Sequence, residues 1–407
     1  MKKLYSFAFF TLPTLLLASF SGVVLDSKTK LPIKNAQISD AKKRVFSDIN
    51  GSFSMQTDAN VTHIKAYGYR PFTLTHETNS TTLFLEPIRI KALYLTFWGA
   101  SNNSGTSKRI YKLLEQTDAN AIVVDVKNEY GSTSFWTGFE QANSYGAHEN
   151  RTNRNIEKFM RRLKEKKIYT IARIVTFKDE LQASNNPEYA IKKDDNVTIW
   201  RNHDNMAWVD PFDPRSHEYA IRIAEEAAKV GFDEINFDYI RFPAKKGLHF
   251  SKESTQENRV KAIETFLDKA QKRLQKYGVF ISVDTYGNIC WADDDNGIGQ
   301  TVSSLAAHAD YLAPMLYPSG FSSGSFYFDY PADHPYAVIY RSVKHIEDRI
   351  PTARVRPWLQ YFKDYKRKRR EYNRFEIQEQ IRATDEAQTN GWMMWSPSSK
   401  YHYEDLR

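Results

Sequence analysis

The stretch HEYAIRIAEEAAKVGFDEINFDYIRFP, residues 217–243, decides the fold, because in it one helical pattern leads into one apolar strand. Apolar residues recur at helical spacing over residues 217–230, and residues 234–240 then form a short, mostly apolar run. A strand that is apolar on both faces is typical of a parallel sheet covered by helices. The stretch therefore predicts helix–strand alternation of the α/β type.

The same alternation extends over residues 89–407 and predicts eight parallel strands with helices between them. Eight strands close a (β/α)8 TIM barrel, and about 320 residues suit such a barrel with insertions. The alternative, a doubly wound open sheet, would favour a glycine-rich phosphate turn. Neither G-x-G-x-x-G nor G-x-x-x-x-G-K-[ST] occurs, so no nucleotide cofactor is expected. The predicted strands span residues 92–98, 121–127, 169–176, 234–240, 279–285, 311–317, 355–361 and 392–395. The predicted helices span residues 107–116, 155–167, 217–230, 256–277, 301–309, 336–348 and 376–389.

The chain changes character near Pro87, before which short β-type runs alternate with turn residues. Residues 22–88 therefore predict a small all-β sandwich, and residues 89–407 the barrel. The β-type runs span residues 23–25, 36–39, 51–55, 63–66 and 81–85.

The first residues, MKKLYSFAFFTLPTLLLASFSG, have the pattern of a secretory signal peptide over residues 1–21. Lys2 and Lys3 precede an apolar run, and Ser19 and Ser21 stand at the small-residue positions before a cut at Gly22. We therefore expect a protein exported to a bacterial periplasm or exterior, with no transmembrane segment after cleavage. A retained N-terminal anchor is the alternative. Cys290 is the only cysteine, which excludes a disulfide framework.

The net charge of +8 does not indicate a nucleic-acid partner. The predicted signal peptide contributes two of these charges, and the single run KRKRR at residues 366–370 contributes five. A broad basic face of the kind that binds nucleic acid is therefore absent. The run itself is either a solvated loop or a contact for an anionic glycan.

Two aspartates mark the predicted catalytic end of the barrel, where the strands have their carboxyl ends. Asp238 ends the fourth strand and Asp284 the fifth, and each is embedded in apolar sequence. Glycosidic cleavage needs one protonated acid and one ionised carboxylate, whose pKa values a low-polarity site can separate. We assign Asp284 as general acid and Asp238 as nucleophile or base. The alternative for Asp238 is a buried structural ion pair with Arg173 or Arg241.

Further strand-end residues are candidates for substrate contact. Asp125 either forms an ion pair with Lys127 or Arg173 or contacts substrate, and Arg173 and Arg241 are expected to orient Asp238. Glu129 lies further into its loop, where we expect a solvated side chain. Flat aromatic rings suit the C–H faces of sugars, although ordinary loop packing is the alternative for each one. The candidate rings are Trp98, Trp136, Trp208, Trp291, Tyr317 and Trp395.

No metal site is expected. The acidic loop WADDDNGIGQ, residues 291–300, lacks the spacing of an EF-hand, and the ten histidines show no H-E-x-x-H pattern. A G-x-S-x-G elbow of the esterase type is also absent.

Eight stretches of the second domain resemble a barrel family of exported bacterial glycoside hydrolases, placed near the α-amylase-like enzymes. DYIRFP is the most specific of them, and the resemblance covers residues 89–407. The stretches are ALYLTFWGAS, AIVVDVKNEYGS, IARIVTFKD, WVDPFDP, GFDEINFDYIRFP, ISVDTYG, APMLYPS and GWMMWSP.

The resemblance implies sugar cleavage but departs from two known patterns. Against the chitinase-type strand motif, the chain has Asn236 and Ile240 at acidic positions. Against α-amylases, Asp238 matches the nucleophile, but the fifth strand ends in Asp284 rather than Glu. In the first domain, GVVLDSKTKLPIKNAQI and FSDINGSF resemble carboxypeptidase-regulatory-like sandwich modules, which are accessory.

The sequence thus predicts a monomeric glycosidase that acts on a polysaccharide or cell-envelope glycan, which is anionic if residues 366–370 contact it. The alternative is a non-catalytic carbohydrate-binding or envelope-structural protein on a degenerate barrel.

Overall fold

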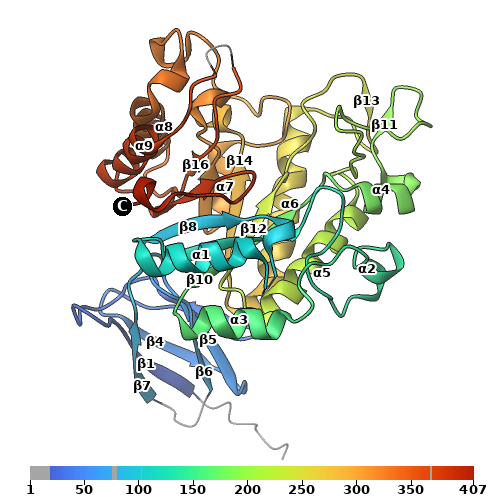
Figure 1. The fold of residues 1–407 in the computed structure, drawn as a ribbon. Coiled ribbons are helices and arrows are strands. Elements are labelled where there is room, and N and C mark those ends of the chain that lie inside the picture. The colour runs from blue at the N-terminus through green and yellow to red at the C-terminus, as the bar shows by residue number, and fades with distance from the viewer. Residues whose placement is uncertain (1–18, 76–79, 102, 367–368) are drawn as a thin grey trace, which may run out of the picture.

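The computed structural model describes residues 19–75, 80–101, 103–366 and 369–407. It comprises an all-β part at the N-terminus and a larger α/β part, which Figure 1 shows in blue and in cyan to red. Most of the predicted signal peptide lies outside the described residues. Within these residues, no helix is long and apolar enough to cross a bilayer.

The larger part is a (β/α)8 barrel, which confirms the predicted fold class. Its eight strands are parallel and pair in the order β15-β14-β12-β10-β9-β8-β17-β16. Parallel bridges from Leu312 to Val355 and from Met315 to Trp358 join the two ends of this order and close the barrel. The strands are β8 (Ile90–Leu95), β9 (Ala121–Lys127), β10 (Tyr169–Val175), β12 (Glu234–Asp238), β14 (Phe280–Thr285), β15 (Tyr311–Pro314), β16 (Trp358–Gln360) and β17 (Gly391–Trp395).

All seven predicted helices are present around the barrel (Figure 1). They are α1 (Gly105–Gln116), α3 (Ile156–Glu165), α5 (Pro214–Val230), α6 (Gln256–Leu274), α7 (Val302–His308), α8 (Pro335–Arg349) and α9 (Arg374–Glu386). Helix α5 shows why the chain forms a helix there. Pro214 opens it behind the capping side chain of Asp213, and Gly231 ends it with a left-handed φ of 99°.

Short elements in the loops after β9, β10 and β12 were not predicted. They are the helices α2 (Glu140–Ser144) and α4 (Glu180–Asn185) and the antiparallel pair β11 (Lys192–Lys193) and β13 (Leu248–His249). Elements of two to six residues carry too few periodic positions to be recognised in sequence.

Alternate strand residues point into the barrel, and their character changes along each strand. On β10, Tyr169 and Ile171 belong to an apolar interior cluster with residues of the other strands. Arg173 continues the same face two residues later, at the carboxyl end of the strand. On this strand the inward face is therefore aromatic and aliphatic below and charged at the mouth.

The N-terminal part packs two sheets around its own apolar core, as the sequence predicts. One sheet has the order β4-β1-β7 and the other β3-β2-β5-β6. The strands are β1 (Ser19–Asp26), β2 (Gln37–Ser39), β3 (Arg44–Phe46), β4 (Ser52–Gln56), β5 (Val61–Lys65), β6 (Phe72–Thr75) and β7 (Ser80–Leu85).

Strand β1 starts before the predicted signal cleavage point. Phe20 is buried and its ring lies 5.1 Å from that of Phe53. A cut before Gly22 would remove Phe20 from the sandwich core.

The sandwich contacts the barrel at the amino ends of the strands, opposite the predicted catalytic end. Lys65 forms an ion pair of 2.7 Å with Asp310, which immediately precedes β15. Tyr67 donates a hydrogen bond to the same carboxylate, and the Gly68 N–H donates to the Tyr311 hydroxyl. The sandwich therefore supports the barrel and contributes none of these contacts to the site.

Candidate active site

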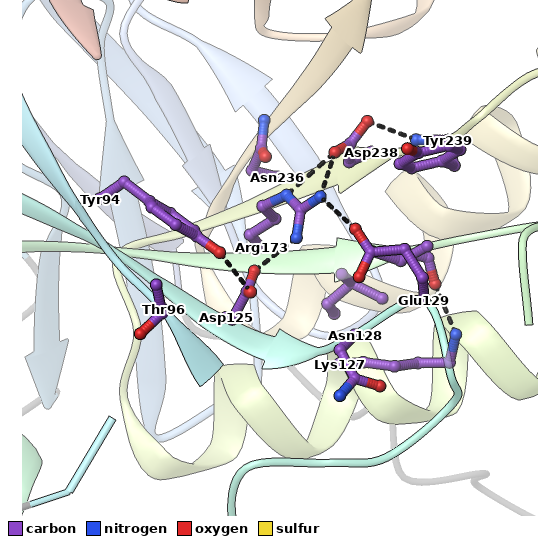
Figure 2. Close-up of polar contacts among 12 residues, drawn as sticks. Tyr94, Thr96, Asp125, Lys127, Asn128, Glu129, Arg173, Asn236, Asp238 and Tyr239 are labelled. Atoms are coloured by element: carbon purple, nitrogen blue, oxygen red, sulfur yellow. Dashed lines mark hydrogen bonds and ion pairs between the residues drawn. The ribbon is translucent and has the colours of Figure 1, made fainter. Parts of the chain in front are cut away.

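Arg173 is the centre of a charged cluster at the mouth of the barrel (Figure 2). Its side chain is 2% exposed. One Nη donates to Asp125 at 2.5 Å, while Nε and the other Nη donate to Oδ2 of Asp238 at 2.9 and 2.5 Å. β10 pairs with β9 on one side and with β12 on the other, so the two acids reach Arg173 from neighbouring strands.

The cluster shifts the pKa values of its members. Burial lowers the pKa of Arg173, but the charges of Asp125 and Asp238 outweigh this effect and raise it well above its usual range. Burial raises the pKa of Asp125, and the Arg173 charge offsets only part of the rise. Tyr94 donates to Asp125 at 2.6 Å and fixes the orientation of that carboxyl group.

Lys127 is not the partner of Asp125. Its ammonium group forms a fully buried ion pair of 2.8 Å with Asp179. Of the two partners that the sequence left open for Asp125, the structure therefore selects Arg173.

Glu129 also belongs to the cluster, so the expectation of a solvated loop side chain is wrong. Its carboxylate lies 3.2 Å from an Nη of Arg173, and its side chain is 32% exposed. Burial alone would raise the pKa of Glu129, but the Arg173 charge and hydrogen bonds lower it below the usual value. Three carboxylates thus share one guanidinium.

Asp284 occupies a separate, tighter environment on β14. Asn236 and the indole of Trp358 donate hydrogen bonds to its Oδ1 at 2.8 and 2.7 Å. Burial, together with the nearby charge of Asp238, raises the pKa of Asp284 well above its usual range. The environment of Asp284 therefore favours the protonated form of its carboxyl group.

Asp238 and Asp284 lie side by side at the same level of the barrel. The register pairs Phe237 of β12 with Val283 of β14, so the next residue of each strand is one of the two aspartates. Both Asp238 oxygens accept hydrogen bonds, Oδ2 from Arg173 and Oδ1 from the Tyr239 N–H at 2.6 Å.

Arg241 does not take the predicted place beside Asp238. Its guanidinium lies over the rings of Trp208 and Tyr239, 5.1 and 5.2 Å from their centroids, and donates to the Phe242 carbonyl. Among the described residues, no carboxylate lies within ion-pair distance of Arg241. Of the two predicted arginines, Arg173 is the one that contacts Asp238.

Two of the predicted aromatic residues border the cluster. Trp395 stacks on Tyr94 with a centroid separation of 4.0 Å and lies 5.1 Å from the Arg173 guanidinium. Burial and the charges of Asp284 and Asp238 raise the pKa of Tyr317, which places its hydroxyl within their field.

The other four predicted rings lie apart from Arg173. Trp98, 70% exposed, follows β8 in the short helix η1 (Phe97–Gly99), and Trp136, 54% exposed, packs on His148 in the loop after β9. Trp208 is buried beneath Arg241. Trp291 stacks on His345 of α8 and donates to Ser342, so it packs against that helix rather than joining the cluster.

Three residues of the site were missed in the sequence: Tyr94, Asn236 and Trp358. In the sequence each looks like an ordinary strand residue. What distinguishes it from the other strand residues is that its side chain points inward at the mouth of the barrel. For Asn236 a signal existed, because it stands two residues before Asp238 on the same face of the strand.

The acidic loop at residues 291–300 is held by its own contacts. Asp295 forms an ion pair of 2.7 Å with Arg259 and accepts hydrogen bonds from the Gly297 and Gly299 N–H groups. Within the described ranges, no group of three or more His, Cys, Asp or Glu side chains is placed to hold a metal ion.

The basic run is partly neutralised. Arg370 forms an ion pair of 2.6 Å with Glu376, and Lys366 donates to the Phe321 carbonyl. Residues 367 and 368 lie outside the described residues.

A (β/α)8 barrel with several buried carboxyl groups at its mouth belongs to the structural class that includes the glycoside hydrolases. A family model described as "Putative glycosyl hydrolase domain" matches residues 92–401. The chain belongs to this family.

Solved structures give two likenesses in fold and one in sequence. The PgaB (BpsB) glycoside hydrolase domain from Bordetella bronchiseptica is 11% identical, with a TM-score of 0.54 over 77% of this chain and 95% of that one. The catalytic domain of a β-amylase from Paenibacillus polymyxa is 10% identical, with a TM-score of 0.50 over 78% and 94%. Both show the barrel fold.

The likeness in sequence is to a hypothetical protein from Ruminiclostridium thermocellum ATCC 27405. It is 36% identical, with a TM-score of 0.41 over 47% of this chain and 96% of that one. No curated protein matches the chain.

Proposed function

We propose that the protein is a glycoside hydrolase that cleaves a polysaccharide or cell-envelope glycan, with Asp284 as general acid and Asp238 as nucleophile or base. One observation carries the proposal. A carboxyl group with a strongly raised pKa stands on the strand next to a carboxylate bound by a guanidinium. This is the unequal pair that hydrolysis of a glycosidic bond requires.

Asp284 supplies the proton. Both of its hydrogen bonds reach Oδ1, from Asn236 and Trp358, so we expect the acidic proton on Oδ2. Protonation of the leaving oxygen by Asp284 would place a negative charge beside Asp238. Arg173 lies on the far side of Asp238 and moderates that repulsion.

Asp238 supplies the negative charge. Two donors of Arg173 on Oδ2 and the Tyr239 N–H on Oδ1 hold the carboxylate in one orientation. From there it attacks the anomeric carbon or activates water, and product stereochemistry distinguishes these routes. Retention corresponds to carboxyl groups about 5–5.5 Å apart and inversion to about 6.5–9.5 Å.

The sugar would lie on the aromatic rings that border the cluster. Trp395 is held by Tyr94 and Trp358, and Tyr317 packs edge-on to Phe362. Rings fixed by their neighbours offer flat apolar surfaces at little entropic cost.

The test is turnover of purified protein on a panel of envelope and plant glycans, with Asp284→Asn and Asp238→Asn as variants. Asp118→Asn is the control, because Asp118 lies on the surface and pairs only with Lys91. We expect each site variant to lose about 10²–10⁴-fold in kcat/KM and the control to lose nothing. Wild-type turnover by both site variants would contradict the assignment.

A second candidate is a non-catalytic carbohydrate-binding protein. It is favoured by the full use of both Asp238 oxygens in hydrogen bonds, as in a structural ion pair. Saturable glycan binding by the wild type without turnover of any bound glycan would support it.

Export is part of the proposal and rests on residues 1–21 of the sequence. We expect the full chain to reach the periplasm of a Gram-negative host and a chain lacking residues 1–18 to stay in the cytoplasm. Cell fractionation checks this expectation, and equal distributions would contradict it.

A further inference from the structure

A cleft of about 550 Å³ opens beside the candidate active site. It lies between the long loop after β10, which includes residues 200–208, and the loop after β12. Tyr239 lines the cleft and directly follows Asp238, so the cleft adjoins the mouth of the barrel. A glycan that reaches Asp238 would therefore extend into it.

The charged residues that line the cleft are mostly cations. Lys178, Arg201, Arg241 and Lys245 line it, against one acid, Asp204. Two of these cations have acidic partners: Lys178 pairs with Asp204 at 3.1 Å, and Arg201 with Glu180 at 2.6 Å.

Arg241 differs because its charge is not compensated by an acid in contact. It donates to the Phe242 carbonyl at 3.0 Å, and no carboxylate of the described residues lies within 4.0 Å of it. Burial lowers the pKa of Arg241, and the charge of Asp238 offsets only part of this effect. Arg241 is partly buried, and a partly buried guanidinium without a paired acid is well suited to an anionic ligand with two oxygens.

Aromatic rings form a sugar-sized surface around this guanidinium. Trp200, Trp208 and Tyr239 line the cleft, and the Tyr239 ring lies between Lys178 and Arg241, 4.9 and 5.2 Å from their charges. Tyr239 has a left-handed φ of 48°, a strained conformation for a non-glycine residue. The indole N–H of Trp208 is buried and has no hydrogen-bond partner.

We propose that this cleft is a subsite for a carboxylate-bearing sugar residue of the substrate, with Arg241 pairing with the carboxylate and Trp200 and Tyr239 contacting the ring. The inference rests on the proposed function and names its substrate class as an acidic glycan of the uronic-acid type. Lys178 and Lys245 add long-range attraction. Residues 366–370, for which the sequence suggested this role, are not needed for it.

The test is binding to an array in which each uronic-acid oligosaccharide is paired with its neutral, carboxyl-reduced form. The full chain carries Asp284→Asn, so that binding is read without turnover. We expect acidic members to bind at least about tenfold more tightly than their reduced forms, and the preference to fall with added salt. Binding confined to neutral members, or to none, would overturn the proposal.

Variants then assign the preference to Arg241. Arg241→Gln is expected to abolish it while binding of the neutral forms is unchanged, and Arg241→Lys to keep part of it, because lysine retains charge but not the planar fork. Lys245→Gln, at an exposed position that leaves the fold intact, is expected to reduce the preference about twofold to threefold. Arg109→Gln on α1 is the control. Equal preference in Arg241→Gln and wild type would overturn the assignment.

The outcomes separate this inference from the proposed function. Charge-selective binding without turnover in wild type would contradict the hydrolase and leave the subsite intact. Turnover of neutral glycans alone, with Arg241→Gln fully active, would contradict the subsite and leave the hydrolase intact.

Discussion

The barrel encloses two buried arginine clusters, one at each end, and their charge balance differs. Near the amino ends of the strands, Arg356 donates to both oxygens of Glu234 at 2.8 and 2.9 Å, and Tyr169 donates to the same carboxylate. At the mouth, Arg173 forms ion pairs with Asp125, Glu129 and Asp238. The cluster near the amino ends has one cation and one acid, whereas the cluster at the mouth has one cation and three acids.

The difference teaches how to distinguish a structural ion pair from a reactive one. Both arginines are almost fully buried, so their burial alone does not separate the two clusters. The lower pair has one acid for one cation, whereas the upper cluster has three acids for one cation and lies beside Asp284, whose pKa is raised. An acid excess that burial disfavours is expected where chemistry uses it.

The largest expected effect comes from removing each arginine. Arg356→Met and Arg173→Met should each destabilise the fold by about 3–5 kcal/mol, because a buried acid loses its partner. Glu234→Met added to Arg356→Met should restore much of the lost stability, because no buried charge remains. Asp238→Leu added to Arg173→Met should not, because Asp125 and Glu129 remain. Urea unfolding measures all four, and equal recovery in the two double variants would remove the distinction.

The next effect is a pH dependence of stability that arises from Asp284 at the mouth. The folded-state pKa of Asp284 is raised, so its contribution is complete below the unfolded pKa and is lost as pH rises through the folded value. Asp284→Asn cannot ionise and lacks this loss. The stability of Asp284→Asn relative to wild type should therefore increase as pH rises. Urea denaturation of both proteins between acidic and mildly alkaline pH checks this prediction. A difference in unfolding free energy that does not change with pH would contradict the raised pKa of Asp284.

A smaller effect separates the three acids of the mouth. Glu129 is one-third exposed and lies at the edge of the cluster, so Glu129→Gln should lower kcat/KM by about tenfold or less. Asp238→Asn should lower it by about 10²-fold or more. The kcat/KM values of the two variants are measured on the same glycan and compared. A larger loss in Glu129→Gln would transfer the role of nucleophile or base to Glu129.

The smallest effect concerns the rings. Trp395→Ala should raise KM by up to about tenfold, because a stacked ring contributes roughly 0.5–1.5 kcal/mol. Trp291→Ala, whose ring packs on His345, should leave KM unchanged and lower only stability. Equal changes in KM would contradict the separation of these rings.

The barrel could be predicted because its strands are buried on both faces, so β9 and β10 are mostly apolar in sequence. Two strands of the sandwich were missed. β3 and β6 have three and four residues, mostly exposed, and therefore lack the apolar signal that marks a strand.

The site was predictable where a charged residue interrupts an apolar strand end, as at Asp125, Arg173, Asp238 and Asp284. Asn236 and Trp358 are uncharged, and amide and indole groups also occur in ordinary cores. Their residue types alone therefore do not mark them as site residues. Trp291 shows the opposite error, because a loop beyond a strand end can fold outward onto a helix.

The measurement that tests the central claim most directly is the protonation state of Asp284 at neutral pH. Infrared difference spectroscopy between wild type and Asp284→Asn reports the carbonyl stretch of a protonated carboxyl group. The account predicts that this band is present in wild type near pH 7 and absent from the variant. A carboxylate band in its place would show Asp284 ionised and would contradict its role as the acid.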